Sequence, residues 1–435
     1  MVRAGQRLPG GWFDPFEPVA GGQDWLDYPA LTDLFPWQQP GCMWNRTWPV
    51  APTHDLLVDR WSAFVAIEDP AARADAYVTP RHGRSITTRV PGLPRLVDLG
   101  PGAPSEPIVR FAPRSFDRQW AFADPRLAKT ESPSLWASVS DQQIFLTSLL
   151  TSSIGRGPGA TVATSVPDKH HFRGSFGAKD VVPLYRDARG TPNADPKALG
   201  AIGEGLGPGA TAAIEDLFAY VYAVLGGADY TERFAEELLT PGPRIPLTAD
   251  ADLFAEAVAF GRELLWLHTY GERFSEGHDG VLGTLLPSIA VDGRLTLPER
   301  PNDIEYDAGT QSLRIGDGKL TGVTPEVWAF EVSGMAVVKK WLGYRTARGA
   351  GRAASSSSPL DQIRPTSWAD EWTTELLELL SVLQRTIDLQ PRGIDLLDRV
   401  VAGPLIAASD LPEPPAELRK PPTGGRGPTQ AALEL

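Results

Sequence analysis

The sequence predicts an α+β fold, with a β-rich part near residues 105–200 and helical layers from residue 211 to 405. Between Ile108 and Arg186, short apolar and aromatic runs are broken repeatedly by Gly and Pro, which is typical of short strands joined by turns. After residue 210, apolar residues recur at helical spacing instead. The 43 Gly and 41 Pro add an expectation of long, irregular connections between short elements.

Helical periodicity is clearest in residues 211–225, where Ile214, Leu217, Phe218 and Val221 fall on one face. A helix over 367–388 is expected to begin at Ser367, which serves as its N-cap. Residues 326–342 predict a strand in which Trp328, Phe330 and Val332 alternate, followed after Gly334 by a helix. The other expected helices cover residues 54–69, 230–239, 252–268 and 394–401.

Composition divides the chain into four segments. Residues 1–50 are rich in Trp, Pro and Gly and predict an extended lead-in that docks on something else. Residues 51–210 form the β-rich part, and residues 211–405 form the mainly helical part. The tail at 406–435 contains too few apolar residues to pack, so disorder is expected there. Within the β-rich part, residues 187–209 predict a long exposed loop.

Charge is segregated along the chain. The net charge of −13 argues at first against a nucleic-acid partner, since phosphates are neutralised by Lys and Arg. Residues 105–186 nevertheless hold ten Lys/Arg against seven Asp/Glu, whereas residues 212–300 hold six against fifteen. Residues 335–360 carry five basic residues and no acidic one. Two basic segments therefore flank an acidic one, and ordinary solvated charge on an acidic protein is the alternative interpretation.

The sequence predicts a cytoplasmic protein in a reducing compartment. Its first residues lack the apolar core of a signal peptide, and nowhere do about 18 apolar residues run together. A membrane role is therefore not expected. Cys42 is the single cysteine, which excludes an internal disulfide and a multi-thiolate metal site, and a small buried side chain is its ordinary role.

No set of residues in the sequence has the spacing of a catalytic or metal site. The adjacent His170 and His171 would point to opposite faces of a strand, so they are not expected to chelate one ion. The Gly-rich stretch Gly203–Gly209 precedes a helix and is the one candidate for holding a nucleotide or S-adenosylmethionine, with a flexible linker as the alternative. We therefore expect no catalytic residue, no cofactor and no metal, and keep the nucleotide-binding enzyme as a second hypothesis.

A series of short segments lies in a fixed order over roughly residues 30–405. The segments in order are DLFPW at 33–37, RTW at 46–48, PRSFDRQW at 113–120, DPRL at 124–127, PDKH at 167–170, PLY at 183–185, FAYVYAVL at 218–225, Tyr230, PRIP at 243–246, residues 264–268, PEVW at 325–328, Ser333-Gly334, WLGYR at 341–345, and Gly403-Pro404. Each segment is short, but the ordered set resembles the C-terminal specificity domain of Type ISP restriction-modification enzymes.

The resemblance implies sequence-specific recognition of double-stranded DNA and supplies no catalytic residue. In that family a nuclease, a helicase-like motor and an adenine methyltransferase precede this region, and this chain departs from the pattern by lacking all three. Either a separate polypeptide supplies the methyltransferase, or the chain is a decayed specificity module. The β-rich part at 51–210 then corresponds to the target-recognition part.

Basic residues in the two basic segments are the candidates for contacting DNA, because Arg can bind guanine through two hydrogen bonds and Lys can bind phosphates. Two alternatives stay open. Phe116, Asp117, Arg118 and Trp120 can equally form a buried aromatic corner with an Asp–Arg pair, and the second basic segment can be solvated surface. The candidates are Arg114, Arg118, Arg126, Lys169, His170, Arg173, Lys179, Lys339, Lys340 and Arg345.

Overall fold

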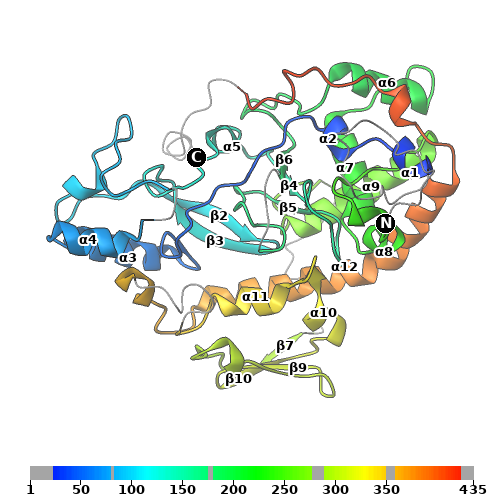
Figure 1. Ribbon diagram of the computed structural model, residues 1–435. Coiled ribbons are helices and arrows are strands. Elements are labelled where there is room, and N and C mark those ends of the chain that lie inside the picture. The colour runs from blue at the N-terminus through cyan, green and yellow to red at the C-terminus, as the bar shows by residue number, and fades with distance from the viewer. Residues whose placement is uncertain (1–22, 80–82, 175–179, 277–288, 349–357, 423–435) are drawn as a thin grey trace, which may run out of the picture.

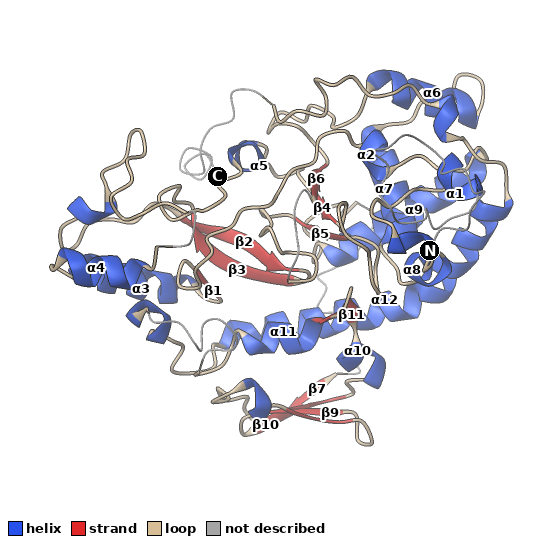
Figure 2. Cartoon of the chain, in the orientation of Figure 1, coloured by secondary structure: helices blue, strands red, loops and turns tan. Residues whose placement is uncertain are grey.

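The computed structural model describes residues 23–79, 83–174, 180–276, 289–348 and 358–422. Helices and several small antiparallel sheets alternate along these ranges, which confirms the predicted α+β class (Figures 1 and 2). Two hydrophobic cores hold them together. One core lies under the helices of the C-terminal half, and the other lies between the β-hairpin and the helices of the N-terminal half.

Short antiparallel strands form four separate sheets. The first has the order β1-β3-β2 and the second the order β5-β4-β6. The third has the order β7-β10-β9-β8 and projects from the body of the molecule, and β11-β12 is the fourth (Figure 1). Their bounds are β1 Val50–Ala51, β2 Ile108–Arg114, β3 Asp117–Phe122, β4 Phe145–Thr147, β5 Thr161–Ala163, β6 Val181–Pro183, β7 Ala290–Asp292, β8 Glu305–Asp307, β9 Ser312–Ile315, β10 Gly318–Thr321, β11 Glu331–Val332 and β12 Met335–Ala336.

The N-terminal core is aromatic. Helix α3 (His54–Ala66) begins where the hydroxyl of Thr53 accepts from the Leu56 amide, and it packs on β1 and β3. Trp48 stacks on Phe64 with ring centroids 5.6 Å apart, inside this core. Helix α4 (Pro70–Tyr77) and the 3-10 turn η1 (Leu96–Asp98) close it from the outside.

Three long helices build the C-terminal core. They are α7 (Ile214–Leu225), α9 (Ala251–His268) and α12 (Asp370–Ala402). At Gly261 of α9, a Cβ atom would lie 1.8 Å from the carbonyl oxygen of Ala219 in α7, so only glycine permits this close packing of the two helices. The short elements around them are α8 (Asp229–Arg233) and the 3-10 turn η2 (Glu237–Leu239).

One continuous helix replaces the two expected near the C-terminus. Helix α12 starts at Asp370 with Ala369 as N-cap, not at Ser367, and it continues through Pro391 to Ala402. A proline removes one backbone hydrogen bond of a helix. The helix survives because Leu389, Leu396 and Val400 on either side of the proline are buried in the core.

Two further helices correct the sequence prediction. Residues 187–209 are not one long loop, since α6 (Pro196–Leu206) begins inside them at the N-cap Asp195. Residues 326–330 are not a strand, since α10 (Pro325–Ala329) begins at the N-cap Thr324. In both helices the capping side chain is followed by proline at the first helical position, which favours a helix start. This signal outweighs the high glycine content of residues 187–209 and the apolar alternation of residues 328–332. The tight β11–β12 hairpin then leads into α11 (Val337–Gly343).

The lead-in joins the two cores. Helices α1 (Gln23–Asp27) and α2 (Leu31–Leu34) belong to the C-terminal core, and the following chain crosses to the hairpin β2–β3 (Figure 1, blue). On the way it forms single bridges between Gln39 and Val181 and between Cys42 and Asp168. Residues 1–22 lie outside the described residues. From residue 23 onward, the lead-in is a largely buried connection between the two cores.

The C-terminal tail is described through residue 422, where disorder was expected from 406. After the 3-10 turn η7 (Ala408–Asp410), Arg419 donates to the carboxylate of Asp33 at 2.7 Å, and Arg186 donates to the carbonyl of Leu418. Polar contacts to the main chain hold the tail, which explains why its low apolar content misled the prediction. No helix in the described ranges is long and apolar enough to cross a membrane. The remaining short elements are α5 Pro133–Ala137, η4 Pro301–Asp303 and η6 Pro359–Gln362.

Candidate nucleic-acid interface

A cleft of about 440 Å³ lies between the lead-in, the end of β2 and helix α11. We call it the basic cleft because six cationic side chains line it against two carboxylates, on a chain whose net charge is −13. The two carboxylates are Asp168 and Asp361. The cationic residues are Arg46, Arg60, Arg114, Lys339, Lys340 and Arg364, and His170 also lines the cleft.

The first wall is built by Arg114 at the end of β2 and by the loop that starts at Asp168. The amide of Asp168 donates to the carbonyl of Ala112 in β2, which fixes this loop beside the strand. Arg114 then donates to the Asp168 carboxylate at 3.1 Å, and the same oxygen accepts from the His170 amide at 2.8 Å. Arg114 is thereby held at the cleft with one carboxylate as its partner.

The second wall is helix α11, which presents Lys339, Lys340 and Tyr344. Both lysines are exposed, and neither forms an ion pair with a described residue. Partial desolvation of the ammonium group and repulsion by Arg114 lower the pKa of Lys340. The two walls thus bring like charges toward each other, which favours an anion between them.

The inner surface of the cleft contains three arginines that sequence reasoning missed. Arg60 of α3 donates to the carbonyls of Trp48, Val50 and Ile363, so it ties the lead-in to the 3-10 turn η6. Burial and repulsion by Arg364 lower the pKa of Arg60 to about 10. Arg60 lies on the same helical face as Leu56, Leu57, Trp61 and Phe64, and this position was the signal for a buried cation.

Arg46 and Arg364 complete the inner surface. Arg46 is buried, lies with its guanidinium 3.9 Å from the centre of the Tyr77 ring, and donates to the Leu127 carbonyl at 2.8 Å. Arg364 donates from Nε to the Asp361 carbonyl at 2.7 Å. Within the described part of the chain, neither arginine has a carboxylate within ion-pair distance. No sequence pattern marked either residue.

Three of the predicted DNA-contacting arginines lie in ion pairs outside the cleft. Arg126 is 3% exposed and donates through two nitrogens to Asp124. Arg345 is fully buried and bridges Asp117 of β3, at 3.1 Å, and Glu375 of α12, at 3.3 Å. These two side chains stabilise the fold and have no accessible guanidinium to offer a ligand.

Arg118 is partly exposed and neutralised. It donates to Glu378 of α12 at 2.5 Å and lies 3.8 Å from the centre of the Tyr270 ring. The aromatic corner considered for residues 116–120 does not form, because Asp117 pairs with Arg345 and Arg118 with Glu378. The two rings also lie apart, since Phe116 packs on His268 and Trp120 on His54. Lys179 lies outside the described residues.

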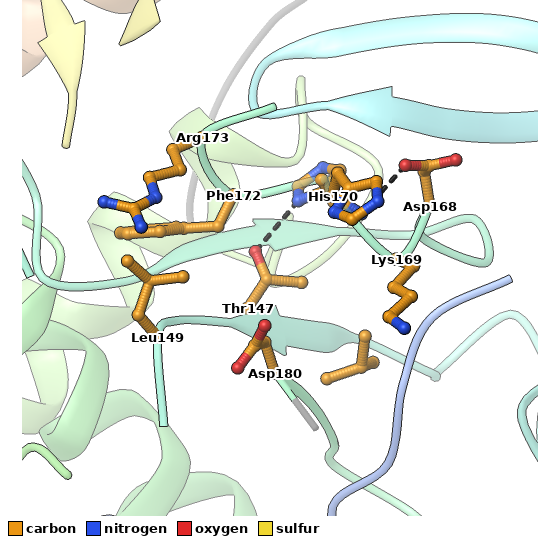
Figure 3. Close-up of a pocket in the computed structure, with 10 residues that line it drawn as sticks. Thr147, Leu149, Asp168, Lys169, His170, Phe172, Arg173 and Asp180 are labelled. Carbon is orange, nitrogen blue, oxygen red and sulfur yellow. Dashed lines mark hydrogen bonds between the residues drawn. The ribbon is translucent and has the colours of Figure 1, made fainter. Parts of the chain in front are cut away.

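Lys169, His170 and Arg173 line a small recess beside the basic cleft (Figure 3). Figure 3 shows Lys169 and Arg173 on opposite sides of this recess. The buried ring of His171 also lines the recess and is hydrogen-bonded through Nδ1 to the Thr147 hydroxyl at 2.9 Å. Burial and repulsion by Arg114 lower the pKa of His171 to about 3, so this imidazole is neutral at neutral pH.

The Gly-rich stretch Gly203–Gly209 is not a cradle for an anion. Gly203 and Gly205 lie within α6, and Gly207 ends that helix. The stretch therefore forms the carboxyl-terminal end of a helix, where backbone carbonyls are exposed, whereas the predicted site needs the amides of a helix start. A Cβ atom at Gly203 would lie 2.4 Å from the Ala210 carbonyl oxygen, so close packing accounts for this glycine.

Comparison with known proteins identifies the family. The sequence model of the Type ISP C-terminal specificity domain matches residues 33–379, most of the chain. The chain belongs to this family. All residues that line the basic cleft fall within the matched range, so the cleft is part of the specificity domain proper.

Solved structures agree with this specificity-domain assignment. The chain in the DrdV–DNA complex is similar over 88% of this chain with 18% identity and a TM-score of 0.58. A nuclease-deletion mutant of the Type ISP enzyme LlaGI with a DNA substrate mimic is similar over 85%, with 16% identity and a TM-score of 0.53. The Type ISP enzyme LlaBIII bound to DNA is similar over 84%, with 14% identity and a TM-score of 0.57. These similarities show a shared fold.

The specificity domain spans only part of those solved proteins. It covers 39% of the DrdV chain, 29% of the LlaGI chain and 23% of the LlaBIII chain. No curated protein matches the sequence.

Proposed function

We propose that this specificity domain recognises a sequence in double-stranded DNA and places it for an adenine methyltransferase of a Type ISP-like restriction-modification system. The observation that carries the proposal is the basic cleft, where six cationic side chains gather on a chain of net charge −13. The family assignment and the DNA in the three similar solved complexes support it.

The two walls of the cleft suit the two kinds of DNA contact. Lys339 and Lys340 are exposed point charges on a helix, which suits contacts to backbone phosphates. Arg114 presents a planar guanidinium held from one side by Asp168, which suits hydrogen bonds to a base edge. Lys169, His170 and Arg173 extend this wall and are further proposed contacts.

The partner proposed for the domain is an adenine methyltransferase, either on a separate polypeptide or in a longer form of the same protein. The cytoplasm is the proposed location, because such a system acts on cellular DNA. The second hypothesis, an enzyme that holds a nucleotide at Gly203–Gly209, loses its structural basis because α6 occupies that stretch.

Selection of duplexes from a random pool tests the proposal. We expect the chain to enrich one sequence and to bind it more tightly than bulk competitor DNA. Replacing both Lys339 and Lys340 by Ala should weaken binding and make the slope of log affinity against log salt shallower by about 0.9 for each lost phosphate contact.

Lys319→Ala is the matched control, since Lys319 of β10 pairs with Asp292 at 3.3 Å in the projecting sheet. We expect this control to bind DNA like the unmodified chain. Enrichment of no sequence, or equal salt slopes for the double variant and the control, would contradict the proposal.

A further inference from the structure

We propose that Lys340 is a modification site, at which a small acyl phosphate bound by the cations of the basic cleft transfers its acyl group to the lysine amine. The inference rests on the proposed function for its consequence, because loss of this positive charge would weaken DNA contact. Such a reaction needs a binding site for an anion and, next to it, an amine that gives up its proton readily. The cleft provides both.

The surroundings of Lys340 attract a small anion. This lysine lies in helix α11 and lines the cleft together with Lys339, Tyr344 and, in the other wall, Arg114. Its ammonium is 5.5 Å from the centre of the Tyr344 ring, and no described carboxylate lies within ion-pair distance of it. The cleft volume of about 440 Å³ falls within the range of roughly 300–1,000 Å³ that admits small ligands. A short acyl phosphate therefore has room to lie between the two walls.

The same surroundings prepare the amine for attack. Desolvation and repulsion by Arg114 lower the pKa of Lys340, and attraction by Asp117 offsets only part of this shift. A lower pKa raises the fraction of neutral amine at neutral pH, and the neutral amine is the form that attacks a carbonyl carbon. The guanidinium that repels the ammonium is also a group that would hold the phosphate.

The transfer balances without any further reactant. The neutral Nζ of Lys340 attacks the acyl carbonyl carbon, so that a C–N bond forms and the C–O bond to the phosphate breaks. The phosphate leaves with the electron pair of that bond and takes up the proton that Nζ loses. Arg114 and Lys339 stabilise the negative charge of the leaving phosphate. The product is a neutral amide, which removes one of the six cations from the cleft.

Acetylation by acetyl phosphate at constant ionic strength, followed at each lysine by mass spectrometry, tests the inference. Lys197 is the matched internal control, because it is exposed in the first turn of α6, pairs with no described carboxylate and lies outside the cleft. We expect Lys340 to react several-fold faster than Lys197, with a rate that saturates with acetyl phosphate and falls when inorganic phosphate is added.

Lys197 should react in proportion to the acetyl phosphate concentration and ignore inorganic phosphate. Equal rates at the two lysines would overturn the inference. So would a faster reaction at Lys340 that neither saturates nor responds to phosphate, since basicity alone would then explain it.

Two variants of Arg114 test its part in the reaction. Arg114→Gln removes both a phosphate-binding group and the repulsion that lowers the pKa of Lys340, so the rate at Lys340 should fall toward that of Lys197. Arg114→Lys keeps a cation at this position and should keep most of the rate. Unchanged rates at Lys340 in both variants would overturn the inference.

Lys340→Arg separates this inference from the proposed function. The arginine keeps the positive charge but is not acetylated, so this variant should keep its affinity for the enriched duplex after treatment. The unmodified chain, treated until Lys340 is acetylated, should bind more weakly, with a salt slope shallower by about 0.9. Equal losses in the two proteins would overturn the inference and leave DNA recognition intact. If the chain enriched no duplex while Lys340 still reacted with saturation, only the proposed function would fail.

Discussion

The cations of the basic cleft and the cations between β3 and α12 differ in their partners, although both sets are mostly arginine. In the cleft, Arg46, Arg60 and Arg364 donate to backbone carbonyls, and none of the three has a carboxylate within ion-pair distance in the described ranges. Between β3 and α12, Arg118 and Arg345 lie against carboxylates of both elements. Whether a basic residue is neutralised therefore depends on the carboxylates that tertiary structure brings to it.

The largest effect is expected from breaking the buried network at Arg345. Arg345→Met leaves the Asp117 carboxylate without its cation and leaves Glu375 with the more distant Arg110, at 3.8 Å, so the free energy of unfolding should fall by about 3–5 kcal/mol in urea denaturation. The triple variant that also carries Asp117→Asn and Glu375→Gln should recover most of this loss. A loss below about 1 kcal/mol in the single variant would remove the assigned structural role.

Arg348→Met serves as the exposed counterpart of that variant. Arg348 pairs with Glu299 through a side chain that is 63% exposed, so its loss should cost no more than about 1 kcal/mol.

Lowering the pH should reduce the free energy of unfolding through protonation of the buried His171. The folded pKa of this imidazole is about 3, whereas an unfolded histidine titrates near 6.5. Between these values the unfolded chain binds the extra proton, so stability falls as pH falls, by about 1.4 kcal/mol per pH unit. His268, whose pKa burial also lowers to about 3, adds the same slope.

His171→Gln should remove about half of the histidine-linked slope, measured as unfolding free energy from pH 6 to pH 4. An unchanged slope in this variant would show that the His171 imidazole is not buried in neutral form.

Removing a cleft cation should affect binding far more than stability. Arg364→Ala deletes a guanidinium that has no carboxylate partner among the described residues, so unfolding free energy should change by about 0.5 kcal/mol or less. Its DNA affinity should drop with a shallower salt dependence. Equal loss of stability in Arg364→Ala and Arg345→Met would erase the distinction between the two regions.

The smallest effect is expected at the two tryptophans whose indole N–H groups lack acceptors. Trp44→Phe and Trp372→Phe each remove an unpaired buried donor, which offsets part of the loss of ring contacts. Thermal unfolding of the two variants should therefore differ little from each other.

Local patterns predicted those elements that local interactions specify. The apolar spacing of 214–225 predicted α7, and the spacing of 252–268 predicted α9. Helices α6 and α10 were missed because their start signals, Asp195-Pro196 and Thr324-Pro325, were weighed less than glycine content and alternation. In these two cases the information was present in the sequence and a capping analysis would have recovered it.

The sequence by itself determined the α+β class, the family and a segregated charge pattern that pointed to Arg114, Lys339 and Lys340. Only the tertiary structure decided which cations line the basic cleft and which are neutralised. Arg345 meets Asp117 across 228 positions of the chain, and Arg118 meets Glu378 across 260. Pairing over such separations depends on how β3, α11 and α12 pack, because a charge interacts with whatever lies within a few ångströms of it, and sequence distance carries no information about that.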